Sequence, residues 1–187
     1  VLPLVATQIL WINLITDSGP ALAMGVDPSV EDVMGRRPRR PEDHVVDAAM
    51  WGGVILIGAV MAAATLGTLD IFLPGGLVDI AGVSTDDLTR ARTAAFTTLV
   101  LAQLFNTLNS RSETVSAFSH LLVNRWLWGA IALGVVLQIA VVEVPLLQAA
   151  FSTSSLDPLH WGVTVVMASL VLWFDEVRKA VRRARTR

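Results

Sequence analysis

Asn13, Thr16 and Asp17 are the side chains in this sequence best suited by type and spacing to bind a cation. Asp17 is the only ionisable residue between positions 1 and 26, a stretch dominated by apolar residues. A carboxylate at the centre of a bilayer costs at least about 2.5 kcal/mol on insertion scales, so it is rarely retained without a function. Asn13 and Asp17 are four residues apart and share a helix face, with Thr16 beside them. This face offers an amide oxygen, a hydroxyl and a carboxylate, the oxygen ligands that Ca²⁺ prefers.

Gly19 and Pro20 follow directly and are predicted to unwind this helix. Pro20 has no N–H and cannot bond to the carbonyl oxygen of Thr16, and Gly19 lowers the cost of unwinding. Backbone oxygens would then be free at the level of Asp17. Because Ca²⁺ takes about six to eight oxygen ligands, other helices must contribute. Gln103 can supply a carbonyl oxygen, or it can instead form a hydrogen bond between helices.

The elements that must position these residues are long apolar segments. Hydrophobic residues make up 53% of the 187-residue chain and charged residues 16%, and the charges cluster between uncharged runs. This pattern is typical of membrane proteins. The run from residue 48 to residue 69 has no charge at all, which disfavours the buried helices of a soluble protein. We predict an all-α membrane protein, a bundle of five transmembrane helices at about residues 2–25, 48–72, 93–108, 126–142 and 159–174.

Basic residues are divided unequally between the two ends of the predicted bundle. Twelve of the 14 lysines and arginines follow the first, third or fifth span, and only Arg90 and Arg92 lie on the other side. The positive-inside rule therefore predicts an N-terminus outside and a cytosolic C-terminus, with a cytosolic loop at 27–47 and a basic cytosolic tail at 177–187. The arginines of the loop either dock on a cytosolic domain or only fix the topology. They are Arg36, Arg37, Arg39 and Arg40.

Several kinds of chemistry are absent from the sequence. It has no cysteine, which excludes disulfides and thiolate metal ligands, and it contains no Gly-rich phosphate loop and no Ser/His/Asp grouping. No catalytic residue and no nucleic-acid partner are expected. The external start and the lack of an initiator Met indicate a piece of a longer protein.

Five segments resemble P-type calcium-transporting ATPases. Residues 8–17 (QILWINLITD) and 20–25 (PALAMG) resemble the sixth transmembrane helix of that family, and residues 36–39 (RRPR) resemble the cytosolic loop after it. Residues 103–110 (QLFNTLNS) resemble the end of the eighth helix, and residues 173–179 (WFDEVRK) the end of the tenth. The resemblance covers essentially the whole chain in order, and its first motif is highly specific.

The resemblance implies helices six to ten of a pump that ATP drives through a phosphorylated aspartate. In that family the residues matching Asn13, Thr16 and Asp17 ligate calcium, and the loop matching residues 27–47 touches the phosphorylation domain. Ca²⁺ would be the transported ion, with ATP and Mg²⁺ bound in cytosolic domains outside this chain. The partners would be the lipid bilayer and the remainder of the pump, namely helices one to five and the cytosolic domains. Asn13 favours calcium, because sodium/potassium-type pumps carry an acid there, and manganese stays open.

Gln103 bears on the number of calcium ions that the pump would transport in each cycle. Reticulum-type pumps, which carry two calcium ions, have a glutamate there that serves one of the two sites, whereas plasma-membrane-type pumps have glutamine. Without that charge the second site should be weak or empty, so we expect export of one calcium ion per cycle. The 13 arginines against one lysine point to a bacterial plasma membrane. Two alternatives stay open: a secondary cation antiporter, which can also use an Asp beside a broken helix, and a non-transporting membrane anchor.

Overall fold

The structure is a computed structural model that describes residues 3–26, 48–73, 76–78, 87–111, 117 and 124–185. Every regular element in this part of the chain is helical. In chain order the elements are α1 (Ala6–Asn13), the π-helix η1 (Leu14–Ser18), α2 (Gly19–Gly25), α3 (Ala48–Phe72), α4 (Leu88–Asn109), α5 (Arg125–Glu143), α6 (Pro145–Phe151) and α7 (Pro158–Arg185).

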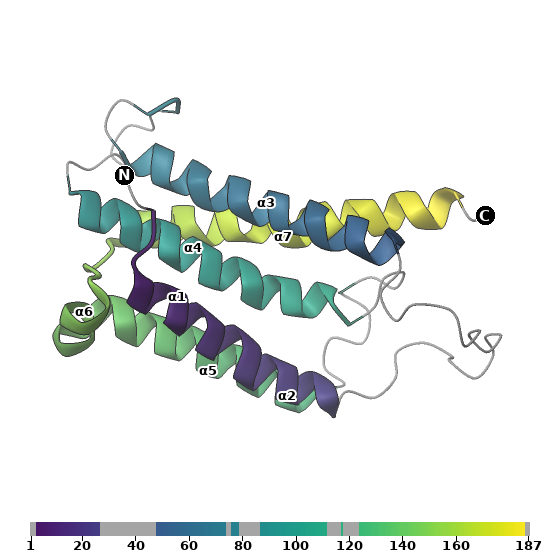
Figure 1. Cartoon of the computed structure of the whole chain (residues 1–187), viewed down its shortest axis with the longest axis horizontal. Coiled ribbons are helices and arrows are strands. Elements are labelled where there is room, and N and C mark those ends of the chain that lie inside the picture. Colours follow the sequence, from purple (N-terminus) through teal and green to yellow (C-terminus); the bar gives the residue numbers. More distant parts are fainter. Residues whose placement is uncertain are drawn as a thin grey trace.

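The long helices lie side by side along one direction (Figure 1). α1, η1 and α2 follow one another as a single rod that lies along α5. α4 contacts α3 and α7 on one side, and η1 and α5 on the other. The start of the chain and the end of α7 lie at opposite ends of the molecule. Both helices with predicted cation ligands, the rod and α4, are therefore neighbours.

α4 is the central helix of the described part. Fourteen of its 22 residues are buried, four of them threonines. Thr93 and Thr107 donate their hydroxyls to the backbone carbonyls of Thr89 and Gln103 in the preceding turn, which satisfies these groups inside the helix. Its N-terminus is capped by Asp87, whose side chain accepts from the backbone N–H of Thr89. This cap explains why α4 begins five residues before the predicted span at 93–108.

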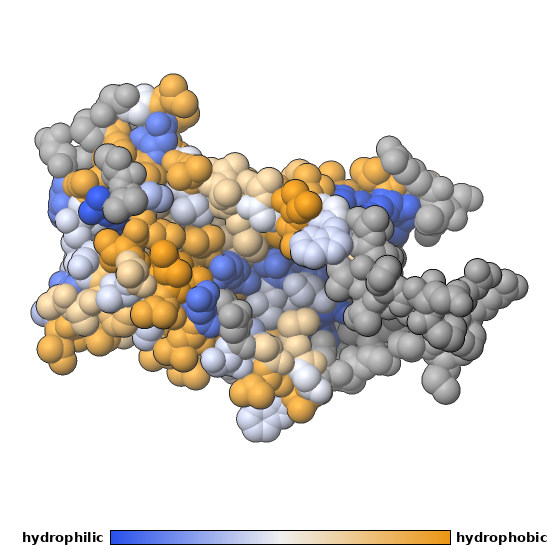
Figure 2. All heavy atoms as spheres, viewed as in Figure 1, coloured by the Kyte–Doolittle hydropathy of each residue, from blue (hydrophilic) through white to orange (hydrophobic). Residues whose placement is uncertain are grey.

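Three helices in the described part of the chain are long and apolar enough to cross a membrane: Met50–Phe72, Arg125–Glu143 and Pro158–Ala184. Many of their large apolar side chains, such as Val54, Leu133 and Val166, are exposed. Figure 2 shows extensive hydrophobic surface on the face it displays. Such surface requires lipid or further protein to cover it.

The predicted spans at 2–25 and 93–108 are not among these three helices. The first is divided into three short helical segments, and α4 has Arg90 and Arg92 in its first turn and five threonines along its length. A helix enclosed by other helices does not need the apolar surface of a lipid-facing one. The bundle of five transmembrane helices and the sidedness of its termini stay predictions.

Two further differences concern the ends of the predicted spans. α7 does not stop near residue 174 but continues through Arg185, so most of the predicted basic tail is helical. The segment after α5 contains the short helix α6, which begins at Pro145 and ends before Ser152, a residue with a positive φ of 53°. The loop at 27–47, with Arg36, Arg37, Arg39 and Arg40, lies outside the described residues, and its docking role stays a prediction.

Candidate cation site

The helix that carries Asn13, Thr16 and Asp17 changes its geometry at these residues. Asn13 ends α1, and η1 runs from Leu14 to Ser18 with π-helical hydrogen bonding. A π-helix bonds residue i to residue i+5, and single π-turns inside α-helices occur frequently at functional sites. The departure from regular α-helix is therefore centred on the predicted ligands.

We expected the chain to unwind at Gly19 and Pro20, and the structure differs. Gly19 is helical, with φ −67° and ψ −57°, and Pro20 lies in the first turn of α2. Proline is tolerated in a first turn because its missing N–H would have no partner there in any case. The π-turn accommodates the missing hydrogen bond and keeps the chain helical.

The predicted ligands of this segment are described to different extents. The Asn13 side chain is exposed, and in the described part of the chain it makes no hydrogen bond. The side chains of Thr16 and Asp17 lie outside what the structure describes. Next to them in sequence, Ile12 and Ile15 are buried and belong to the core cluster that includes Leu104 of α4. These apolar contacts hold η1 against α4.

Gln103 lies on α4, the helix that contacts η1. Its Oε1 atom is buried and has no hydrogen-bond partner in the described part of the chain. A buried amide oxygen without a partner costs about 1–3 kcal/mol, and an unpartnered buried group is unusual in a native structure. A cation, or a donor from outside this chain, would satisfy it.

Gln103 faces a hollow of about 470 Å³ between α2, α3 and α4. Pro20 and Met24 line it from α2, Met61 from α3, and Gln103 and Asn106 from α4. Pro20, which lines this hollow, is three residues after Asp17 in the sequence. Asn13 is not among the residues that line it. The structure thus brings Gln103 close to the start of α2, but it does not bring Asn13 and Gln103 into one hollow.

A second hollow of about 370 Å³ continues toward the C-terminal end of α4. It shares Met61, Asn106 and Ser110 with the first, and it reaches Asp175 and Arg178 of α7. Figure 2 shows hydrophilic surface in the recessed middle of this face. A polar recess flanked by apolar helices is a suitable place for the remaining part of a cation site.

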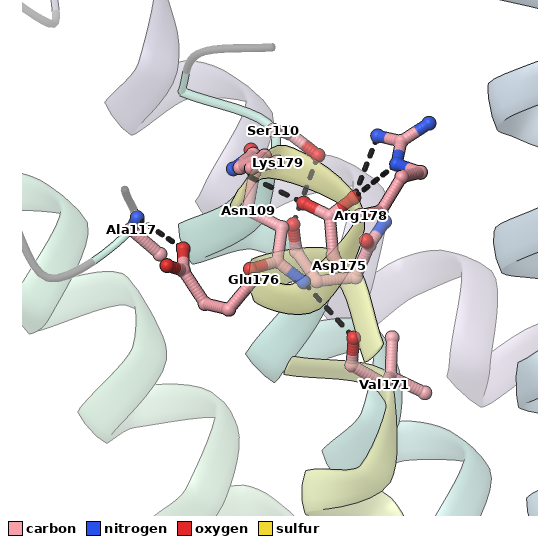
Figure 3. A network of polar contacts seen from close by, with 9 residues as sticks. Asn109, Ser110, Ala117, Val171, Asp175, Glu176, Arg178 and Lys179 are labelled. Atoms are coloured by element: carbon pink, nitrogen blue, oxygen red, sulfur yellow. Dashed lines mark hydrogen bonds and ion pairs between the residues drawn. The ribbon is translucent and has the colours of Figure 1, made fainter. Parts of the chain in front are cut away.

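A buried polar cluster fixes the end of α4 beside this recess (Figure 3). Asp175 and Lys179 of α7 are almost fully buried and form an ion pair, with 3.0 Å between Oδ2 and Nζ. Arg178 donates to the other carboxylate oxygen of Asp175 over 2.7 Å. Lys179 also donates to the backbone carbonyl of Asn109 over 2.9 Å. A cation at the C-terminus of a helix is favourable, so Lys179 joins α4 to α7.

The described residues do not by themselves complete a metal site. They include no group of three or more His, Asp and Glu side chains that could hold a metal ion. A divalent ion in a desolvated site needs more negative charge than the Asn13 and Gln103 amides supply. A cation site at this place would need further negative charge, from Asp17 or from groups beyond the described residues.

Comparison with known proteins identifies a matching family. Residues 1–181 match the family described as "Cation transporting ATPase, C-terminus". The chain belongs to this family. The resemblance found in the motifs is thereby confirmed, and the chain is the C-terminal region of such an ATPase.

Relatives from bacteria and animals are similar along most of the chain. The calcium-transporting ATPase of Bacillus subtilis (strain 168) is 36% identical over 90% of this chain and 18% of its own length. The calcium-transporting ATPase type 2C member 2 of Mus musculus is 35% identical over 95% of this chain and 18% of its own. The calcium-transporting ATPase type 2C member 1 of Homo sapiens is 32% identical over 98% of this chain and 19% of its own length. The chain spans about a fifth of the length of these relatives.

Proposed function

We propose that this chain forms part of the ion-translocating membrane domain of an ATP-driven pump that exports calcium from the cytosol. One calcium ion per cycle binds mainly through Asn13 and Asp17, with Thr16 beside them. Gln103 belongs to a second cation site, which is weak or empty because the neutral amide lacks the charge that a divalent ion needs. ATP and Mg²⁺ bind in cytosolic domains outside the chain, and the rest of the pump supplies the remaining ligands. The pump lies in the plasma membrane of a bacterium.

One observation carries the proposed site. The π-helical segment η1, which contains Thr16 and Asp17, packs on α4, whose Gln103 keeps a buried oxygen without a partner in the described part of the chain. A distorted helix beside an unpartnered acceptor is suited to a hard cation and unsuited to apolar packing alone. Several relatives are named as calcium-transporting ATPases, which supports calcium as the ion. Family membership favours a pump over a secondary antiporter or a passive membrane anchor.

Asp17→Asn in the full-length pump tests the site. The amide keeps the shape of the side chain but removes the negative charge that balances a desolvated divalent ion. We expect calcium-dependent phosphorylation by ATP to fall below detection at calcium concentrations that saturate the wild type. The measurement is the phosphoenzyme formed from labelled ATP across a calcium titration.

Asp157→Asn is the matched control. Asp157 is 66% exposed in its side chain and pairs with Arg90 and His160, away from the rod. The same charge change there should leave the calcium dependence of phosphorylation unchanged. Calcium transport at a near-normal rate in Asp17→Asn would contradict the proposed site.

A further inference from the structure

α5 holds the rod of α1, η1 and α2 in a regular antiparallel register. A Cβ atom added to Gly19 would lie 3.6 Å from the Cβ atom of Ala130, which is ordinary contact. One turn along, a Cβ atom added to Gly134 would lie 3.4 Å from a methyl carbon of Ile15 in η1, and 3.2 Å from Leu104 of α4. Small residues therefore let α5, η1 and α4 meet closely at Gly134.

The next turn of this contact is polar. Trp11 of α1 donates its indole N–H to Oε1 of Gln138 on α5, over 3.1 Å. The amide nitrogen of Gln138 donates in turn to the hydroxyl of Thr97 on α4, over 3.2 Å. Gln138 has no exposed surface, and both ends of its amide are bonded. One side chain thus joins both helices that carry predicted cation ligands: Trp11 lies two residues before Asn13, and Thr97 six residues before Gln103.

Small residues and hydrogen bonds contribute differently to such a contact. A seam of small residues lets helices approach closely, but it tolerates sliding along the helix axis. A buried polar side chain defines the axial position, because a shift leaves its donors and acceptors without partners. Buried polar networks with every member bonded are rigid for the same reason. The axial position of α1 relative to α4 is therefore defined at Gln138.

We propose that Gln138 is a positioning residue for the cation site. It holds α1 and η1 at the depth along α4 where the Asn13–Asp17 segment binds its ion, and it touches no ion itself. The inference rests on the proposed function of that segment. It also accounts for Trp11, the one tryptophan that the sequence places in the middle of a predicted span.

Gln138→Met in the full-length pump tests this role, because methionine keeps the volume and removes both hydrogen bonds. We expect the calcium concentration for half-maximal phosphorylation to rise roughly tenfold, the lower end of the effect of removing groups that orient metal ligands. Maximal phosphorylation per mole of folded pump should stay unchanged. Trp11→Phe removes only the indole donor and should also raise the calcium concentration for half-maximal phosphorylation. It replaces Gln138→Met as the test variant if Gln138→Met fails to fold.

Two comparisons separate positioning from stability. In the double variant Trp11→Phe/Gln138→Met the indole donor is gone and the Thr97 hydroxyl is the group that loses its partner at this contact. Thermal stability should therefore rise above that of Gln138→Met, while calcium affinity stays low. Gln148→Met is the matched control, because Gln148 bonds Val142 and Ser155 and does not reach α1. A half-saturating calcium concentration in Gln138→Met within twofold of the wild type would overturn the positioning role. Retained calcium-dependent phosphorylation in Asp17→Asn would instead contradict the proposed cation site, so the two inferences can fail separately.

Discussion

At the scale of single residues, the sequence identifies groups that are unusual for their surroundings but not the partners that folding gives them. Asp17 is evident because no other charge lies between residues 1 and 26. The hydrogen bond between Trp11 and Gln138 joins residues 127 positions apart, and nothing in either neighbourhood indicates it. The spacing of four between Asp175 and Lys179 was a usable sign of an ion pair. Their burial against the end of α4 is set by helix packing.

The buried pair of Asp175 and Lys179 leads to a prediction about stability. Asp175→Asn removes the charge that faces Lys179, whose side chain is only 1% exposed. Breaking a buried pair in this way costs about 3–5 kcal/mol, because one charge is left buried without a partner. Lys179→Met should cost less, because Arg178 still neutralises Asp175. Thermal inactivation of the detergent-solubilised pump measures the order of the two effects.

The double variant and a surface variant complete this experiment. Asp175→Asn/Lys179→Met removes both charges of the buried pair and leaves only the partly exposed Arg178 without Asp175. The loss of stability in the double variant should therefore be smaller than the sum of the single losses. Arg125→Gln changes an exposed residue at the start of α5 and should alter stability by less than about 0.5 kcal/mol. Additive losses would mean that the two side chains do not act as a pair.

At the scale of elements, uniformly apolar segments were predicted well and distorted ones were not. α3 covers the predicted residues 48–72, because no charge or proline interrupts its apolar pattern before Asp70. The signals at Gly19 and Pro20 predicted a break in the helix but not its form. A missing N–H can be accommodated by an unwound turn or by a π-turn, and the choice depends on what packs against the helix. Here Ile15, Gly134 and Leu104 leave no space for an unwound loop.

Pro20→Ala tests the connection between the π-turn and ion binding. Alanine restores an N–H that can bond the carbonyl of Thr16, so the segment should shift toward regular α-helix. We expect calcium affinity to fall roughly tenfold, about 1.4 kcal/mol, with stability equal to or above that of the wild type. The measurements are the calcium dependence of phosphorylation and the temperature of inactivation.

Pro145→Ala is the control for this change. Pro145 also lies in the first turn of a helix, α6, and it is not among the residues that line the hollow beside Gln103. Its replacement should leave calcium affinity unchanged. If Pro20→Ala binds calcium as the wild type does, the π-turn is a consequence of the proline alone and has no part in binding.

At the scale of the whole molecule, the described helices are an incomplete unit. Large apolar side chains are exposed on α3, α5 and α7, and the chain spans about a fifth of its relatives' length. α4 is less apolar than α3 and α5, and it is the helix that the other elements enclose. Hydropathy predicts the helices that face lipid and underestimates those that face protein. The missing helices are therefore as important to the recess beside Gln103 as the helices present.

This incompleteness makes the number of transported ions a property of the whole pump. Gln103 presents a neutral, unpartnered oxygen to the recess, and the described residues bring no cluster of acids to it. A desolvated divalent ion needs compensating charge more than one further neutral oxygen. A second site at Gln103 should thus be weak or empty unless the missing helices bring an acid to it. We expect one calcium ion bound per phosphorylatable pump.

Counting bound calcium at saturation tests this expectation in three forms of the pump. The wild type should bind one ion per phosphorylation site. Gln103→Glu adds the missing charge at the recess and should raise the count toward two, because the new carboxylate can pair with an ion that the amide could not neutralise. Gln148→Glu adds the same charge on α6, outside the recess, and should leave the count at one. Two ions in the wild type would show that the charge comes from the missing helices and that Gln103 does not limit the site.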